Sequence, residues 1–321
     1  MPIAAPTTSA PIDHAQYRAV FALAFDDSAV YGRSITGSIN DPGGQHDDLA
    51  RFDRRTGTII TADAVTRPLA ALRAGDWLFV VAVVFNDDCI TACRGELLRV
   101  DPQTLQVEHR FKLDRVSNSL TVVGDTLWVA TAHGVVRVSI NAGETLASPQ
   151  GDFGETETIV GLAAPPHPNR VYAVVAQPLQ RYALASLDPT SGRLMARGPM
   201  IGSGPGGAGI SAGDDGLWFS IATGMLGYSV KVDPDTLTAL DVRLDAQARP
   251  TALQGTDALW VDESWGGSIS CADRATGTIL WRQAIADSPV SFARDTTGRA
   301  TPFHEWKPIE TPTLCKTREG P

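Results

Sequence analysis

The sequence predicts an all-β protein folded as a single β-propeller with seven four-stranded blades. Three observations predict this class: a recurring apolar–aromatic pair, an Asp-containing turn after most of these pairs, and turn residues about every 8–12 positions. The pairs recur at intervals of roughly 40–50 residues, the length of one propeller blade. Their aromatic members are Tyr31, Phe79, Trp128, Tyr172, Trp218 and Trp260.

The Asp-containing turn closes the apolar strand that follows each aromatic pair. In most copies a Thr stands three residues after the Asp, as in LLRVDPQTLQV, and in LASLDPTSGRL Ser191 takes its place. The carboxylate in such a turn accepts backbone N–H groups, and a following Gly supplies positive φ. The third repeat, VVRVSINAGET, has lost the Asp. The Asp residues are Asp53, Asp101, Asp188, Asp233 and Asp273.

Each repeat contains four short strands. In the fifth these are GAGISAGDD, GLWFSIAT, YSVKVDP and TALDVRL, from the innermost strand to the outermost. Alternating apolar residues and frequent turns exclude a helical array.

Six repeats span residues 20–287, and a partial one follows. SPVSFARDTTG resembles an inner strand with its turn, and Trp306 lies near the repeat spacing. We expect a seventh blade made from the C-terminal segment and closed by N-terminal residues around Ile12 to Ala19, which removes exposed sheet edges. Six blades is the alternative. Residues 1–11 are expected to be a flexible leader and 12–321 the propeller.

Composition limits the partners of this chain of 321 residues. Its formal net charge is -9 and it has no basic stripe, which argues against nucleic acid. No apolar run reaches the roughly 20 residues of a membrane span. We expect a soluble monomer.

The cysteines favour an oxidising compartment. Cys89 and Cys93 lie close enough to close one turn, and a bond between Cys271 and Cys315 would tie down the C-terminal tail. A zinc site is disfavoured because CxxxC stands alone. The compartment is therefore expected to be extracytoplasmic (secreted, periplasmic or cell surface), or cytoplasmic if Met1 is the native start, since no signal peptide is present as written.

The repeats resemble those of quinoprotein-like and YVTN-type β-propellers. CADRATGTILW, residues 271–281, is similar to the quinoprotein tryptophan-docking pattern, with Cys271 in place of its first Ala. DDGLWFS, residues 214–220, is similar to the repeat of virginiamycin B lyase-type propellers. The resemblance implies the fold. It implies no activity, because the calcium and catalytic motifs of the quinone-dependent dehydrogenases are not found and these families differ widely in function.

Acidic loops offer one candidate site. Loops after second strands carry Asp87, Asp88, Asp262 and Glu263, whose carboxylates suit Ca²⁺ if the ring brings them to one face. Trp265 lies beside the last two as a candidate ligand contact. The alternative is that these acidic loops are only solvated. No cofactor other than calcium is suggested.

Three arginines offer a second candidate site. Arg67, Arg115 and Arg249 precede inner strands at similar offsets, so a propeller would place them around one mouth of the channel. Guanidinium groups there could bind a carboxylate or phosphate, or could pair with neighbouring acidic loops instead. His133 is a weak catalytic candidate.

Two functions remain open at this point. The first is a binding or scaffold protein, exported, that holds a partner protein, glycan or small anion on one face. The second is a lyase or hydrolase that works at the channel mouth with a divalent metal. The sequence does not decide whether the chain is an enzyme.

Overall fold

The computed structural model describes residues 19–36, 46–84, 94–113, 116–132, 134–146, 152–165, 169–205, 207–213, 216–223, 226–244, 251–255, 258–263, 268–285 and 290–315. Across these ranges the chain forms strands joined by turns, with two 3₁₀ segments, η3 (Pro178–Gln180) and η4 (Thr313–Cys315), and no α-helix. No helix in this part of the chain is long and apolar enough to cross a membrane. The all-β prediction is confirmed.

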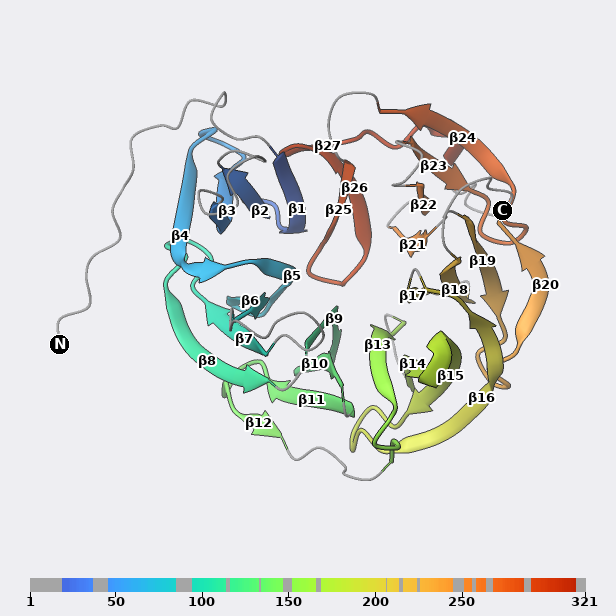
Figure 1. The fold of residues 1–321 in the computed structure, drawn as a ribbon. Helices are drawn as coiled ribbons and strands as arrows, with labels where there is room; N and C mark the ends of the chain where they lie inside the picture. The colour runs from blue at the N-terminus through green and yellow to red at the C-terminus, as the bar shows by residue number, and fades with distance from the viewer. Residues whose placement is uncertain are drawn as a thin grey trace.

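The strands form six sheets arranged as a ring around a central axis (Figure 1). Five of the sheets have four strands each, hydrogen-bonded in chain order and antiparallel. The first two sheets contain β5 (Pro68–Ala74), β6 (Trp77–Val83), β7 (Gly95–Val100) and β8 (Val107–Leu113), then β9 (Val116–Val123), β10 (Thr126–Thr131), β11 (Gly134–Ser139) and β12 (Thr145–Leu146). The next two contain β13 (Thr158–Ala163), β14 (Val171–Gln177), β15 (Arg181–Leu187) and β16 (Leu194–Ser203), then β17 (Ala208–Gly213), β18 (Gly216–Thr223), β19 (Leu226–Val232) and β20 (Ala239–Arg243). The fifth contains β21 (Thr251–Gln254), β22 (Leu259–Glu263), β23 (Ser268–Ala272) and β24 (Ile279–Ala284).

The sixth sheet joins the two ends of the chain. Its seven strands run in the order β27-β26-β25-β1-β2-β3-β4, and β1 meets β25 in parallel through a single pair, Ala24 with Arg294. Segments about 270 residues apart in the sequence therefore lie side by side in one sheet. The strands are β1 (Ala19–Phe25), β2 (Ala29–Thr36), β3 (His46–Asp53), β4 (Ile59–Thr66), β25 (Val290–Arg294), β26 (Ala300–His304) and β27 (Lys307–Pro308).

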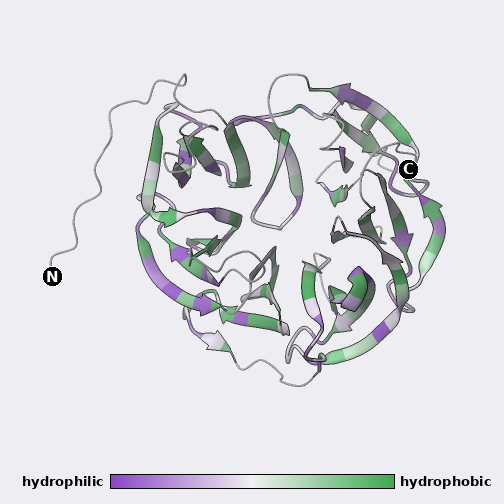
Figure 2. Cartoon of the chain, viewed as in Figure 1, coloured by the Kyte–Doolittle hydropathy of each residue, from purple (hydrophilic) through white to green (hydrophobic). Residues whose placement is uncertain are grey.

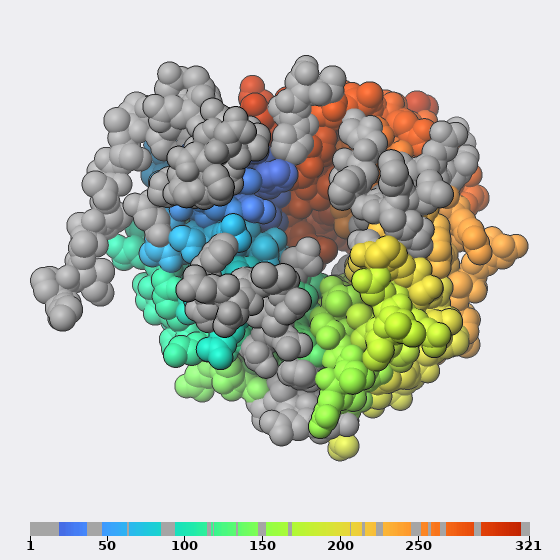
Figure 3. All heavy atoms as spheres, viewed as in Figure 1, coloured from blue at the N-terminus to red at the C-terminus, as the bar shows by residue number. Residues whose placement is uncertain are grey.

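The core lies between neighbouring sheets. All six repeated aromatic residues are buried, with exposures from 0% at Trp128 to 6% at Tyr172, as predicted from their spacing. The first strand of each sheet packs against its neighbours near the axis, and second and third strands are the most buried. Outer strands such as β8 carry hydrophilic stretches (Figure 2). Side chains fill the ring and leave a narrow hollow near its middle (Figure 3).

The Asp turns form as predicted. The Oδ1 atom of each repeat Asp accepts the backbone N–H groups two and three residues later, at 3.0 and 2.8 Å respectively in the Asp53 turn. Positive φ follows in every copy, at Gly where the repeat has one and at Leu105 (58°) and Leu237 (57°) where it does not. In the third repeat Ser139 replaces the Asp, and its Oγ accepts only one such N–H, from Ala142 at 3.3 Å.

Cationic side chains link two of the sheets to the sheet that follows each of them. Arg137, on the third strand of its sheet, donates to the Thr190 carbonyl in the following sheet's Asp turn at 2.5 Å. Lys231 does the same to the Arg274 carbonyl at 3.2 Å. Because each contact bridges adjacent repeats, the ring is held by directional bonds as well as by apolar packing.

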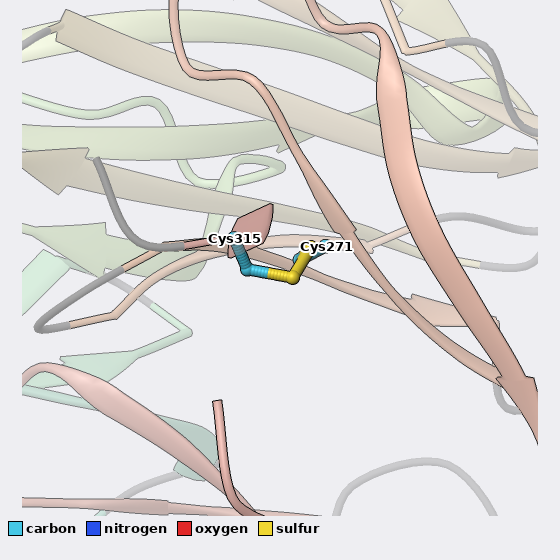
Figure 4. The surroundings of a disulfide bond; sticks show 2 residues. All are labelled: Cys271 and Cys315. Carbon is cyan, nitrogen blue, oxygen red and sulfur yellow. A yellow bond between two sulfur atoms is a disulfide. The ribbon is translucent and has the colours of Figure 1, made fainter. Parts of the chain in front are cut away.

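The C-terminal tail is fixed to the preceding sheet, as the cysteines predicted. Cys271 on β23 and Cys315 on η4 form a disulfide with a Cα–Cα distance of 5.9 Å (Figure 4). Both residues are buried. The predicted Cys89–Cys93 pair lies outside the described residues.

Two expectations about the last repeat concern Trp306 and the N-terminal segment. Trp306, despite its spacing, does not lie on a second strand: it follows β26 in the turn to β27 and stacks on Phe52 at 5.8 Å between ring centroids. The segment expected to close the ring lies outside the described residues except for Ala19, which begins β1.

Candidate functional site

A small cavity lies where the first strands of several sheets end. Its volume is about 20 Å³, room for one or two water-sized groups. The residues around it come from five sheets and are far apart in the sequence, so only the packing of the sheets brings them together. They are Thr121, Ala163, Ala164, Ser211, Ala212, Leu253, Gln254, Arg294, Thr297, Gly298, Arg299 and Ala300.

The turn between β25 and β26 supplies one side of this cavity. Asp295 Oδ1 accepts the N–H groups of Thr297 at 2.8 Å and Arg299 at 3.0 Å, and Gly298 has φ +82°. This local pattern is why the sequence Asp-Thr-Thr-Gly folds into a tight turn. The turn fixes Arg294 at the end of β25, where its Nη1 donates to the Gly298 carbonyl at 2.9 Å.

Gln254 supplies a second polar group, at the end of β21. Its backbone N–H donates to Ser211 Oγ on the neighbouring β17 at 3.2 Å, which fixes the position of the residue. The residue is 5% exposed, and neither its side-chain oxygen nor its nitrogen has a hydrogen-bond partner in the described part of the protein. A buried primary amide with both ends unsatisfied is costly, so this group needs an explanation.

The cavity has a cationic character. Burial lowers the pKa of the Arg294 guanidinium and outweighs the opposing effect of Asp295. An arginine nonetheless stays protonated near neutral pH. No Asp or Glu lines the cavity itself, and the nearest acidic residue identified, Asp295, lies in the adjoining turn with its Oδ1 bonded to backbone N–H groups. The arrangement therefore suits an anion, because a guanidinium in a partly desolvated position gains most from a negative partner.

A second, wider groove lies on the sheet β13–β16. Its volume is about 650 Å³ and its walls include Glu157, Leu179, Arg181 and Arg197. Glu157 accepts both guanidinium ends of Arg197, one of them at 3.0 Å, and this pair lowers the Glu157 pKa against the effect of burial. Leu179 is 82% exposed with φ +64°. Most charge in this groove is thus already neutralised within the protein.

The structure places only some of the predicted site residues. Arg67 is exposed between β4 and β5 with φ +49°, and its backbone N–H donates to the Asp47 carbonyl at 2.7 Å. It does not line either cavity. Asp262 lies on β22, partly buried. The remaining candidates lie outside the described residues: Asp87, Asp88, Arg115, His133, Arg249 and Trp265.

Glu263, a predicted calcium ligand, is 3% exposed and bound within its own sheet. Its Oε1 accepts the Ser270 hydroxyl at 2.6 Å and Arg282 Nε at 3.1 Å. Over the described residues no group of three His, Cys, Asp or Glu side chains is placed to hold a metal ion. The calcium hypothesis stays a prediction.

Sequence reasoning missed Gln254 and Arg294. Both are the last residue of the first strand in their repeats, which the register with the second strands shows. Alignment of the repeats on their second strands would have shown polar residues at Gln254 and Arg294, and also at Arg73, where others have Phe25, Val122 and Ala212. That signal was present, but nothing local distinguishes it from ordinary surface variation.

Comparison with known proteins supports the fold alone. No family model and no curated protein matches the sequence. Among solved structures, dihydro-heme d1 dehydrogenase NirN is similar with a TM-score of 0.57 and 14% identity, over 91% of this chain and 66% of NirN. AztD from Citrobacter koseri is similar at 0.52 and 12%, over 85% and 88% of the two chains. The Dos1 propeller is similar at 0.56 and 11%, over 85% and 75%.

These likenesses confirm the predicted β-propeller. At sequence identities this low, the ligand or activity of a similar protein cannot be transferred to this chain. The chain spans just under two thirds of NirN, so what that larger protein does as a whole does not bear on this one. The quinoprotein-like and YVTN-type resemblance stays a prediction beyond the fold.

Proposed function

We propose that this chain is a binding propeller that holds a small carboxylate at the end of its channel. The observation that supports this most is Gln254, whose amide is buried beside Arg294 with neither end bonded in the described part of the chain. A native protein keeps such a group where a ligand or ordered water completes its bonds. The adjacent guanidinium makes an anion the natural ligand.

The size of the site limits what it takes. A volume of about 20 Å³ admits only the carboxylate head of a ligand, so the body of the ligand would lie outside the cavity. A carboxylate fits an arginine in one plane through two parallel N–H···O bonds. A phosphate needs more donors and more room.

The architecture we propose has seven blades. The strands β1–β4 form one blade and β25–β27 a three-stranded seventh, joined where β1 meets β25. The six-bladed alternative would count this sheet as one unit, but seven strands across exceed the four of every other sheet. A seven-bladed ring also explains why the β25–β26 turn reaches residues of distant sheets.

We further propose that the protein folds in an oxidising compartment. The Cys271–Cys315 disulfide supports export, since such bonds persist outside the reducing cytosol. Thiol titration of the unreduced, denatured protein tests this: four reactive thiols would contradict it.

The binding proposal is tested by calorimetric titration with acetate and propionate, against chloride at equal ionic strength. Arg294→Met should abolish binding and Gln254→Leu should weaken it at similar side-chain volume. Arg181→Met is the matched control, because Arg181 is an exposed arginine of the groove and does not line the proposed site. Binding that survives Arg294→Met but fails in Arg181→Met would move the site to the groove.

An enzyme remains the alternative function. A lyase or hydrolase would need a metal or base near the channel, and the candidates Arg115, Arg249 and His133 are those to replace. Thermal unfolding with Ca²⁺, with a chelator and with a quinone cofactor separates the two ideas, because a ligand at a hundredfold excess over its Kd stabilises by about 2.7 kcal/mol. A shift with Ca²⁺ and none with carboxylates would favour the enzyme.

A further inference from the structure

We infer that the turn between β14 and β15, with the groove that it lines, is a docking site for a peptide segment of a partner protein that carries an apolar side chain near an acidic one. The turn consists of residues 178–180. The inference does not depend on the proposed carboxylate site, because the two sites lie at opposite ends of the β13–β14 pair. Ala163, at the end of β13, lines the cavity, whereas Gln177, at the end of β14, lines the groove.

The turn exposes a leucine on a strained backbone. Leu179 has φ 64° and Gln180 has φ 54°, and left-handed backbone costs free energy for a residue with a Cβ atom. Leu105 and Leu237 also have positive φ, but their exposures are 3% and 1%, so burial of their side chains offsets the cost. Leu179 is 82% exposed and gains no such burial among the described residues. Strain that packing does not offset is a reason to infer a function.

Hydrogen bonds hold this turn in place. The Gln180 carbonyl accepts the Gly204 N–H at 3.0 Å, and the Tyr182 hydroxyl donates to the Gly204 carbonyl at 3.2 Å. These bonds fasten the turn and β15 to the residue that follows β16, and the ring of Pro178 fixes its own φ. A backbone that is already ordered loses little conformational entropy when a partner covers it, which favours binding.

The groove beside the turn has an excess of positive charge. Among the described residues that line it, Arg181 and Arg197 are basic and Glu157 is the only acidic one. The Glu157 carboxylate accepts both ends of the Arg197 guanidinium and the Gly154 N–H, the last at 2.9 Å. Since this acid is already bonded, the exposed Arg181 guanidinium suits a carboxylate of the partner, and a basic segment would be repelled.

The size and polarity of the groove fit a short peptide. Its volume of about 650 Å³ lies within the range of sites that hold drug-sized ligands. The Thr156 hydroxyl and the Gln177 amide belong to its walls and offer donors and acceptors of the kind that a peptide backbone needs. Pro178 and Leu179 add apolar surface for one side chain. A peptide supplies the apolar group, the carboxylate and the backbone amides together.

Selection of phage-displayed random heptapeptides on the intact protein tests the inference. The enriched sequences should combine Asp or Glu with a large apolar residue a few positions away. Synthetic peptides with these sequences are then titrated with the protein by fluorescence anisotropy. The inference is overturned by enrichment no greater than on an unrelated immobilised protein, or by enrichment of basic sequences.

Variants assign the binding to this site. Leu179→Asn removes the apolar group but keeps a residue that tolerates left-handed backbone, and it should weaken peptide binding about tenfold or more. Arg181→Met should weaken binding about 2- to 5-fold and reduce its dependence on salt. The matched controls are Leu240→Asn and Arg55→Met, at an exposed leucine and an exposed arginine that do not line the groove, and they should leave binding unchanged.

Two further results separate this site from the carboxylate cavity and from a structural role. Leu179→Gly should raise the midpoint of thermal unfolding and still lose peptide binding, a combination that a purely structural role would not give. Peptide binding should persist in Arg294→Met. Binding that is unchanged in Leu179→Asn, or that is lost in Arg294→Met alone, overturns the inference and leaves the carboxylate proposal to its own test.

Discussion

Breaking the Cys271–Cys315 disulfide should lower the free energy of unfolding by about 4 kcal/mol. The bond closes a loop over a sequence separation of 44 residues. In the chain-entropy treatment, the denatured chain then regains about 13 cal/mol/K of entropy, which at room temperature is about 4 kcal/mol. The loop contains the last strands of one sheet and all of β25–β27, so the effect falls on the part of the ring that joins the two ends.

The assay compares one protein with itself. Guanidinium unfolding, followed by tryptophan fluorescence, is measured with and without a reductant in a Cys89→Ser/Cys93→Ser background, so that only this bond responds. No side chain changes, so packing contributes nothing to the difference. Both cysteines are buried, so the reductant should act only once the protein begins to unfold.

Two results would refute this reasoning. An unfolding free energy that changes by less than about 1 kcal/mol would show that the tail is held by packing and not by the cross-link. Rapid reduction in native buffer would show that this end of the ring opens freely. Cys271→Ala/Cys315→Ala, which also removes two buried side chains, should cost at least as much as reduction.

Three further predictions concern the ring itself. The Thr56 backbone N–H lowers the pKa of the Asp53 carboxyl group to about 2. The stabilisation that the ionised Asp53 gives the folded state is therefore present above the ordinary pKa of 3.8 and is lost as pH falls towards 2. Asp53→Asn should flatten the pH dependence of the unfolding midpoint. Arg137→Met, which removes the charged bond to the next sheet's turn, should cost about 1–3 kcal/mol in guanidinium unfolding. Leu237→Gly should destabilise the protein by about 1–3 kcal/mol, because burial of the Leu237 side chain stabilises more than its positive φ costs. Leu179→Gly should stabilise the protein by up to about 1 kcal/mol, because Leu179 also has a positive φ but its side chain is exposed. Changes of the same sign in the two unfolding midpoints, measured by thermal unfolding, would contradict this.

Features set within one repeat could be predicted from the sequence. The hydrogen bonds of the Asp turns join residues two and three positions apart, so a four-residue pattern such as DPDT contains both the donors and the acceptor. Burial of Trp128 or Trp218 follows from strand alternation, which is also local. The first-strand assignment of SPVSFARDTTG was right for the same reason.

Features that depend on how the sheets pack together could not be predicted. Trp306 has the spacing of a second-strand aromatic, yet it lies in a turn against Phe52 because the last repeat packs on the first. Arg67 lines neither cavity, and Arg115 and Arg249 lie outside the described residues, so the three-arginine site stays a prediction. A repeat spacing does not say which way each side chain points relative to the axis.

By itself the sequence determined the class of fold, the turns, the buried aromatic residues and the tie between Cys271 and Cys315. Only the tertiary structure decided that Gln254 and Arg294 share a cavity, because they lie in different sheets and their approach depends on how those sheets pack. Local bonds repeat with the sequence and can be read from it. A cavity lined by several sheets depends on all the repeats together, since the angle between each sheet and the one before it decides where the next sheet lies.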